Sequence, residues 1–180
     1  MPTLTTDRLT LRPWRDDDAD VVLDLYSRLE VQRYIGRVPR LMQTRAEALA
    51  RIAAWRDLSH PLHQIWAVEP AGTRRPIGTL LLKSIPASRP ADAPDAAPQP
   101  SGDTEIGWHF HPDHWGRGYA VESASAVLDH AFAGGLDRVV AVTNPANLAS
   151  QRVCTRIGMS HLGRSDAYYD LDCELFEIRA

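Results

Sequence analysis

The stretch His114-Trp-Gly-Arg-Gly-Tyr-Ala120 decides the fold of this chain. It follows a strand-like run, Thr104-Glu-Ile-Gly-Trp-His-Phe-His111, and opens a helical pattern over residues 120–132. A glycine-containing turn between a strand and a helix directs free main-chain N–H groups to one point, and the helix dipole adds positive charge there. Gly116 and Gly118 can adopt positive φ and let a ligand approach the backbone. This pattern is typical of a phosphate or pyrophosphate site; an ordinary strand-to-helix turn is the alternative.

Two other phosphate-binding motifs are excluded. The sequence contains no G-x-x-x-x-G-K-[ST], and its one lysine is Lys83, so the chain is not a P-loop nucleotidase. The dinucleotide motif G-x-G-x-x-G needs a glycine where Val121 stands. It also needs an acidic residue closing the next strand, and Val139-Val-Ala-Val-Thr143 offers none.

A second informative segment lies downstream. Residues 138–142 read as a short buried strand, which Pro145 ends. Asn147 is a good helix N-cap, and Gly158 stands where a helix typically ends. Ser150 therefore lies on the first turn of a short helix, near the mouth of the preceding strand. The combination of this segment with the upstream turn is far more specific than either one alone.

Together these segments resemble the GNAT superfamily of acyl-CoA-dependent N-acyltransferases, and within it the ribosomal-protein N-acetyltransferase (Rim-type) branch. The resemblance rests on residues 6–14, 105–122 and 147–159, so it covers the chain from end to end. The pyrophosphate signature of the superfamily is [Gln/Arg]-x-x-Gly-x-[Gly/Ala]. Gly118 and Ala120 match it, whereas Trp115 replaces the Gln or Arg. Because pyrophosphate binding depends on main-chain N–H groups, this departure weakens the resemblance little.

The order of elements predicts a mixed, mostly antiparallel α/β sheet. Strand and helix patterns follow one another as strand, two helices, three strands, helix, strand, helix and two strands. The resemblance implies the GNAT fold, with about seven strands, about four flanking helices and a V-shaped splay between the fourth and fifth strands. At 180 residues, the chain is expected to form one domain over residues 1–180.

One segment breaks the pattern. Residues 84–103 hold five of the 13 prolines and almost no large apolar side chain. Such a sequence cannot bury enough surface to offset the entropy lost on ordering. We expect a flexible, solvated Pro/Ala-rich insertion between the third and fourth strands, and a lid or partner-binding arm is the alternative.

Composition excludes several classes of protein. A net charge of −3 and a pI near 6.1 argue against nucleic-acid binding through bulk charge. The sequence shows no membrane span and no signal segment, and its two cysteines form no disulfide framework. These features predict a cytoplasmic, reduced protein. Cys154, in an apolar stretch, is expected to be a buried structural thiol.

The resemblance implies acetyl-CoA as cosubstrate. The strand edge at Phe110 and His111 would pair with the pantetheine arm, and a main-chain N–H there would polarise the thioester carbonyl. Asn147 would bond to a pantetheine amide. The residues expected to surround the pyrophosphate are Trp115, Gly116, Arg117, Gly118, Tyr119 and Ala120.

Catalytic residues are harder to assign. Strand alternation places Glu105, Gly107, His109 and His111 on one face, and we expect Glu105 to be the general base, with His109 as second choice. Many GNAT enzymes protonate the thiolate with a tyrosine on the last core helix, but no tyrosine lies between residues 119 and 168. Ser150 is the expected substitute, and Tyr168 or Tyr169 is the alternative. The histidines lack further ligands at suitable spacing, so no metal is expected.

The acceptor is the least defined partner. In GNAT folds the connection between the first two helices lines the acceptor groove, and here that connection is residues 31–42. Its Arg33, Arg37 and Arg40 would suit an acidic acceptor, and a solvated loop explains them equally well. The resemblance implies a protein N-terminal amine or a small-molecule amine, and it allows a homodimer. A non-catalytic acyl-CoA-binding sensor is the competing hypothesis.

Overall fold

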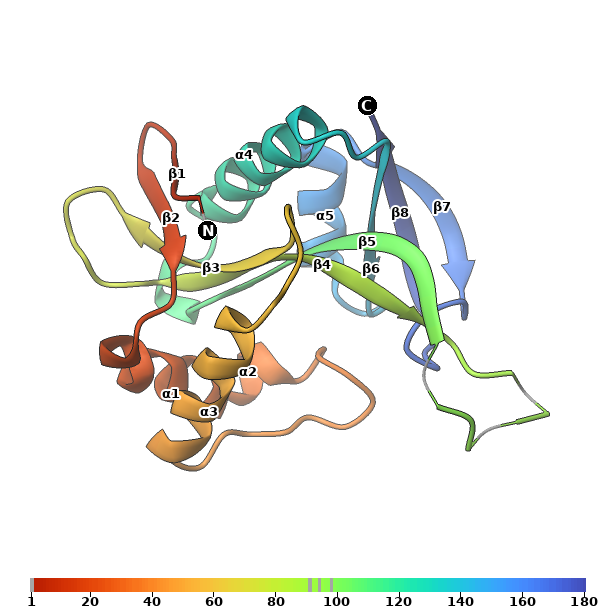
Figure 1. The fold of residues 1–180 in the computed structure, drawn as a ribbon, viewed down its shortest axis with the longest axis horizontal. Helices are drawn as coiled ribbons and strands as arrows, with labels where there is room; N and C mark the ends of the chain where they lie inside the picture. The colour runs from red at the N-terminus through yellow and green to blue at the C-terminus, as the bar shows by residue number, and fades with distance from the viewer. Residues whose placement is uncertain (1, 91, 94, 98) are drawn as a thin grey trace.

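The computed structural model describes residues 2–90, 92–93, 95–97 and 99–180 (Figure 1). Its eight strands form one sheet in the order β1-β2-β3-β4-β5-β6-β8-β7. Neighbouring strands are antiparallel except β5 and β6, which are parallel. The strands are β1 (Leu4–Thr5), β2 (Leu9–Pro13), β3 (Gln64–Pro70), β4 (Gly78–Ala87), β5 (Gln99–Phe110), β6 (Arg138–Thr143), β7 (Ser160–Ser165) and β8 (Cys173–Arg179). The predicted fold class is confirmed, and β1 is the strand that the sequence did not reveal.

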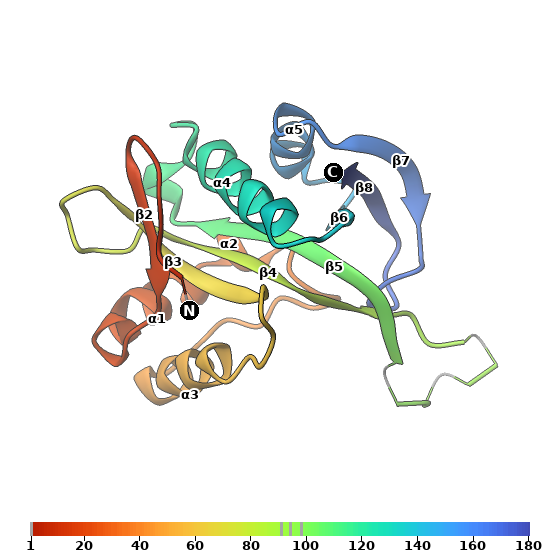
Figure 2. The same cartoon turned by 45° about the horizontal axis from the view of Figure 1, so that its top comes forward.

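Helices cover both faces of the sheet (Figure 2). One face carries α1 (Ala19–Ser27), α2 (Leu29–Gln32) and α3 (Arg45–Arg56), and the other carries α4 (Tyr119–Ala133) and α5 (Leu148–Arg156). Short 3-10 turns precede α1 and α4, at Asp16–Asp18 and Pro112–His114. The described residues therefore form one α-helix, α2, beyond the approximately four expected. Within the described ranges, no helix is both long and apolar enough to cross a membrane.

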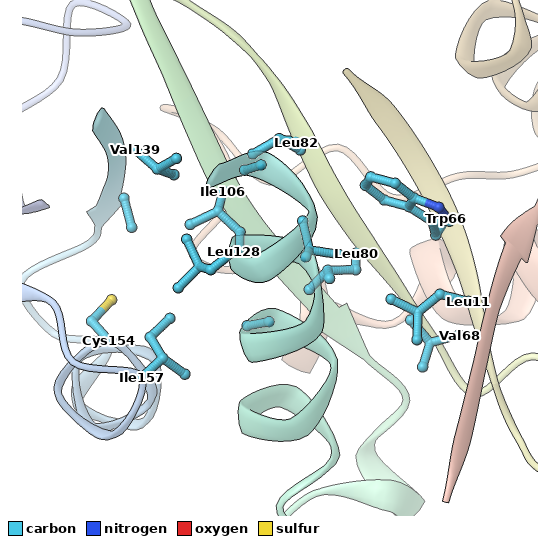
Figure 3. Close-up of a cluster of buried hydrophobic side chains, with 14 of the residues drawn as sticks. Leu11, Trp66, Val68, Leu80, Leu82, Ile106, Leu128, Val139, Cys154 and Ile157 are labelled. Atoms are coloured by element: carbon cyan, nitrogen blue, oxygen red, sulfur yellow. The ribbon is translucent and has the colours of Figure 1, made fainter. Parts of the chain in front are cut away.

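The larger hydrophobic core lies between the sheet and α4 (Figure 3). Leu128 of α4 packs there among side chains from the central strands, such as Leu80 and Ile106. Cys154 of α5 and Ile157, the residue that caps its C-terminal end, also belong to this core. A second core lies on the opposite face and contains Tyr26 of α1. Ile106 and Phe110 of β5 belong to the first core, whereas the ring of His109, on the other face of the strand, packs against Tyr26 of the second.

A buried ion network ties the first helix to the sheet. Arg12 of β2 donates to Asp18 at 2.7 Å and to Glu69 of β3 at 2.9 Å. Its side chain is only 5% exposed, so the two carboxylates satisfy a cation that would be costly to bury alone. The network holds the start of α1 over β2 and β3, and thereby sets where the rest of α1 meets the sheet.

The predicted insertion over residues 84–103 begins and ends in regular strand. Pairing of β4 with β5 continues as far as Ala87 and Gln99, after a register shift between Ser84 and Pro86. Beyond this pairing, Ser88 donates its main-chain N–H to Ala167 at 2.8 Å, and Arg89 forms an ion pair with Asp170 at 2.5 Å. The insertion is thus joined to the connection between β7 and β8. Positions 91, 94 and 98 of the insertion lie outside the described residues.

Candidate active site

The strands β5 and β6 diverge, as the resemblance implied. Their register, in the described part of the chain, consists of one pair, Glu105 with Val140. His111 donates its main-chain N–H to Ile77 at 2.9 Å, so its hydrogen bonds point toward β4. Because neighbouring strand residues direct their hydrogen bonds to opposite edges, Trp108 and Phe110 direct theirs toward the splay. The main chain of Phe110 thus faces the open edge, whereas the N–H of His111 is already bonded to Ile77, just before β4.

A cavity of about 390 Å³ occupies this splay. It is lined by residues from α2, β5, the turn before α4, β6 and α5. The structure brings most of the predicted site residues to this cavity: His109, Phe110, Trp115, Gly116, Gly118, Tyr119, Ala120, Asn147 and Ser150. Three others, Glu105, His111 and Arg117, lie outside its lining. The cavity passes from the α4–α5 side of the sheet toward α2, where Arg33 lines it and Arg37 and Arg40 do not.

The turn before α4 has the conformation that its glycines suggested. Gly116 and Gly118 adopt φ of 73° and 79°, as predicted. The first hydrogen bond of α4 runs from the N–H of Glu122 to the carbonyl of Gly118 at 3.0 Å. The N–H groups of Tyr119, Ala120 and Val121 therefore precede the ladder of the helix and point out of its positive end. All three residues line the cavity.

An N-terminal brace supports this turn from behind. Glu122 accepts from Thr6 at 2.5 Å and from Arg8 Nε at 2.7 Å, and Arg8 Nη1 also donates to the carbonyl of Arg117 at 3.1 Å. Burial acts to raise the pKa of Glu122, but the hydrogen bonds from Thr6 and Arg8 outweigh it, so the pKa lies below its ordinary value. Glu122 is therefore a charged support for the turn.

Two side chains are oriented toward the cavity by their own hydrogen bonds. Asn147 caps α5, because its Oδ1 accepts from the N–H of Ser150 at 3.2 Å, and this confirms the predicted N-cap. The cap leaves the Asn147 amide nitrogen as a donor. Trp115 is 46% exposed, and its indole N–H donates to the carbonyl of Phe110 at 2.7 Å. At Phe110, the main-chain N–H is then the group that remains for a ligand.

His109 belongs to a chain of hydrogen bonds on the face of the sheet that carries α1, opposite α4 and α5. The Tyr26 hydroxyl donates to Thr79 Oγ1 at 3.0 Å and lies 3.0 Å from His109 Nδ1. With the phenol proton on Thr79, Nδ1 of His109 is the donor and Nε2 keeps a lone pair. Burial, and then the charges of Arg51 and Lys83, lower the pKa of His109 to about 4, so the imidazole is neutral near pH 7. Burial raises the pKa of Tyr26 to about 12, which keeps the phenol protonated.

Glu105 has a different environment from the one expected of a general base. Its carboxylate is paired with Lys83 Nζ at 2.9 Å and accepts from the Tyr169 hydroxyl at 2.5 Å. The residue is 7% exposed. Burial, and then the charge of Glu105, raise the pKa of Tyr169. The sequence did not reveal Lys83 as a neighbour of Glu105, or Tyr26 as a neighbour of His109. Lys83 stands opposite Glu105 in the β4–β5 register, which becomes visible only once the two strands are aligned.

The environment of Cys154 and the grouping of metal-ligating side chains complete the description of the candidate residues. Cys154 is fully buried, and burial raises the pKa of its thiol to about 12, as suits the structural role predicted for it. Across the residues that the structure describes, no three His, Cys, Asp or Glu side chains are grouped so that they could hold a metal ion.

The sequence matches the model of a known family. Residues 8–160 match the Acetyltransferase (GNAT) domain. The chain belongs to the GNAT acetyltransferase family. It is therefore an acyltransferase, and solved proteins of similar fold include complexes with coenzyme A and with acetyl-CoA.

Relatives of this GNAT protein include N-acetyltransferases from several bacteria. An uncharacterized N-acetyltransferase of Bacillus subtilis, YoaA, is 32% identical over 164 residues, which cover 90% of this chain and 85% of that protein. RimJ of Mycobacterium smegmatis, solved in complex with CoA-disulfide, superposes with a TM-score of 0.75 at 20% identity, over 99% of this chain and 86% of that one. The ribosomal-protein-S5-alanine acetyltransferase of Vibrio fischeri gives 0.75 at 17% identity, over 99% and 97%. These two structures show a shared fold.

Proposed function

We propose that this GNAT protein transfers the acetyl group of acetyl-CoA to a primary amine by direct attack in a ternary complex. The observation that carries the proposal is one cavity that combines the open edge of β5, the N-terminal N–H groups of α4 and the Asn147 amide. An acyl-CoA has a matching order of groups, since its pyrophosphate, pantetheine amides and thioester follow one another along an extended molecule.

The cofactor half of the cavity would bind by main-chain donors. The N–H groups from Gly116 to Ala120 would hold the pyrophosphate, where the α4 dipole favours negative charge. Trp115 and Arg117 would flank it from the same turn. Asn147 would donate to a pantetheine carbonyl, and the N–H of Phe110 would donate to the thioester carbonyl oxygen. That last bond becomes stronger as negative charge develops on the oxygen during attack.

His109 would handle the amine. The reaction forms a C–N bond to the acetyl carbon and breaks the C–S bond, while one proton leaves nitrogen and one proton ends on sulfur. The free lone pair of His109 Nε2 would accept a hydrogen bond from the neutral amine and take its proton as the C–N bond forms. Glu105, whose oxygens are already bound by Lys83 and Tyr169, would instead hold the strand that carries His109.

Ser150 would act on the leaving thiolate. Its main-chain N–H is fixed on Asn147, so its position on the first turn of α5 is set, and it lines the cavity. Its hydroxyl would donate the proton to sulfur and regain one from solvent. Tyr169, the alternative donor from the tail, would be poorly placed for this because its hydroxyl is held by Glu105.

The acceptor would enter from the α2 side, between Glu30, Arg33 and Tyr34. Either a protein N-terminal amine or a small-molecule amine would supply the primary amine. The names of the RimJ and S5-alanine relatives support a protein N-terminus as the first acceptor to test.

The decisive experiment combines binding with turnover. We expect titration calorimetry to detect acetyl-CoA, and a thiol reagent to detect free coenzyme A when peptides with varied N-termini or small amines are added. If calorimetry detects binding of acetyl-CoA but no amine leads to release of free coenzyme A, the alternative of a non-catalytic acyl-CoA-binding sensor would be favoured. A protein that binds no acetyl-CoA would overturn the proposal.

A further inference from the structure

Buried polar atoms without a partner point to a further ligand contact. In the part of the chain that the structure describes, five buried side-chain N or O atoms have no hydrogen-bond partner. Two of them, Thr143 Oγ1 and His114 Nδ1, belong to residues that line the same cavity. A buried hydroxyl without a partner costs free energy, and native proteins rarely leave one so. The cavity is therefore a place where a ligand would complete the hydrogen bonding.

Thr143 has the more defined position of the two. It is the last residue of β6, is only 7% exposed, and is held in register opposite Glu174 of β8. It lies three residues beyond Val140, the β6 residue that pairs with Glu105. In parallel strands this places Thr143 level with Trp108 of β5, whose main-chain groups face the splay. A chain-like ligand in the splay would pass between them.

We propose that the Thr143 hydroxyl hydrogen-bonds the pantetheine arm of the acyl-CoA as it passes between β5 and β6. The proposal rests on the proposed function and extends it to a residue of the opposite strand. Pantetheine amides offer both N–H and C=O groups, and a threonine hydroxyl both donates and accepts. The arm would then be held from both sides, by the main chain of β5 and by a side chain of β6.

Packing alone would be served equally well by valine. Valine has the shape of threonine without the hydroxyl, and it fits a strand at least as well. Replacing an unpaired buried hydroxyl with a methyl group is expected to leave stability equal or higher. If the hydroxyl contacts the ligand, replacing Thr143 with valine should weaken acetyl-CoA binding while stability stays equal or rises. A purely structural role of the hydroxyl does not predict this combination.

The test is Thr143→Val, with Thr143→Ser as the matched control that keeps the hydroxyl. By calorimetry we expect Thr143→Val to weaken acetyl-CoA binding about 3- to 10-fold, the range of one neutral hydrogen bond, and Thr143→Ser to stay within about twofold of the wild type. Binding of ADP, which has the pyrophosphate but no pantetheine, should be unchanged in both variants. The melting temperature of ligand-free Thr143→Val should equal or exceed that of the wild type.

Three results would overturn the inference while leaving the proposed function intact. They are unchanged acetyl-CoA affinity in Thr143→Val, an equal loss of ADP affinity, and a melting temperature several degrees below the wild type. A wild-type protein that fails to bind acetyl-CoA would instead defeat the proposed function, and the inference with it.

Discussion

The middle of β5 and its C-terminal end differ in how the polar groups around them are satisfied. In the middle of the strand, where Glu105 pairs with β6, the Glu105 carboxylate is bound by Lys83 and Tyr169. At the C-terminal end the strand edge at Phe110 is open, and across the splay Thr143 has a buried hydroxyl without a partner. Satisfied groups hold a structure together, whereas unsatisfied groups in a cavity are available to a ligand. On this ground we propose that Glu105 belongs to the scaffold and that the chemistry takes place where β5 and β6 diverge.

The largest effect is expected from His109→Gln. Glutamine keeps a polar contact to Tyr26 but cannot take a proton, so kcat should fall about 100-fold, the lower range for a general base. Because the pKa of His109 is lowered to about 4 by burial, its ring is neutral above about pH 5. Wild-type kcat should therefore show no acid limb between pH 5 and 7, and a loss should begin only as pH falls toward 4. Steady-state rates across this range measure both effects.

The matched variant Glu105→Gln tests the reverse assignment. If Glu105 is part of the scaffold, Glu105→Gln should keep kcat within several-fold of the wild type. A large loss of kcat in Glu105→Gln together with near-normal turnover in His109→Gln would make Glu105 the base and reverse the comparison.

The next largest effect is on the free energy of unfolding, and it concerns the ion pair between Lys83 and Glu105. Lys83→Met removes the cation from a carboxylate that is only 7% exposed. The remaining charge is then poorly compensated, so the free energy of unfolding should fall by about 2 kcal/mol, moderated because Lys83 is itself 28% exposed. Urea unfolding measures the loss. Acetyl-CoA affinity should be unchanged, and the double variant with Glu105→Gln should recover part of the stability. No recovery would show that Lys83 acts through packing alone.

The cofactor half of the site could be predicted from the sequence because its conformation is local. The positive φ of Gly116 and Gly118 and the Asn147 cap each depend on residues within one turn. Strand alternation likewise placed Phe110 on the opposite face of β5 from His109. The predicted mostly antiparallel sheet follows from the same short-range patterns.

The acceptor half could not be predicted, because its contacts join distant segments. Glu105 was expected to be the general base, but its carboxylate has partners at positions 83 and 169, and the strand register that brings them together is not visible in one segment. His111 was expected to offer its N–H, but the register with β4 decides which edge that group faces. The ends of the insertion form strand although their proline content suggested otherwise, because β4 and β5 continue to pair there.

A smaller effect is expected at the turn before α4. Gly118→Ala places a Cβ at φ of 79°, where the backbone should receive the pyrophosphate, so acetyl-CoA affinity should fall about 10-fold. Gly72→Ala is the matched control, since Gly72 has the same φ of 79° in the turn between β3 and β4 and a Cβ there meets no neighbour within 4 Å. Both variants should lose about 1 kcal/mol of stability, but only Gly118→Ala should weaken binding. Equal binding by both would place the pyrophosphate elsewhere.

The smallest effect is expected from Arg8→Met, which removes the brace behind this turn. Arg8 is 52% exposed, so its ion pair with Glu122 should contribute less than about 1 kcal/mol to stability. Its bond to the Arg117 carbonyl nevertheless fixes the turn, so acetyl-CoA affinity should fall about 3-fold. Arg45→Met is the matched control, because Arg45 is 53% exposed and forms an ion pair with Asp20 at a distance from the cavity. If the two variants bind acetyl-CoA equally, the turn keeps its shape without Arg8. The glycines of the turn and the start of α4 would then be enough to form the pyrophosphate site.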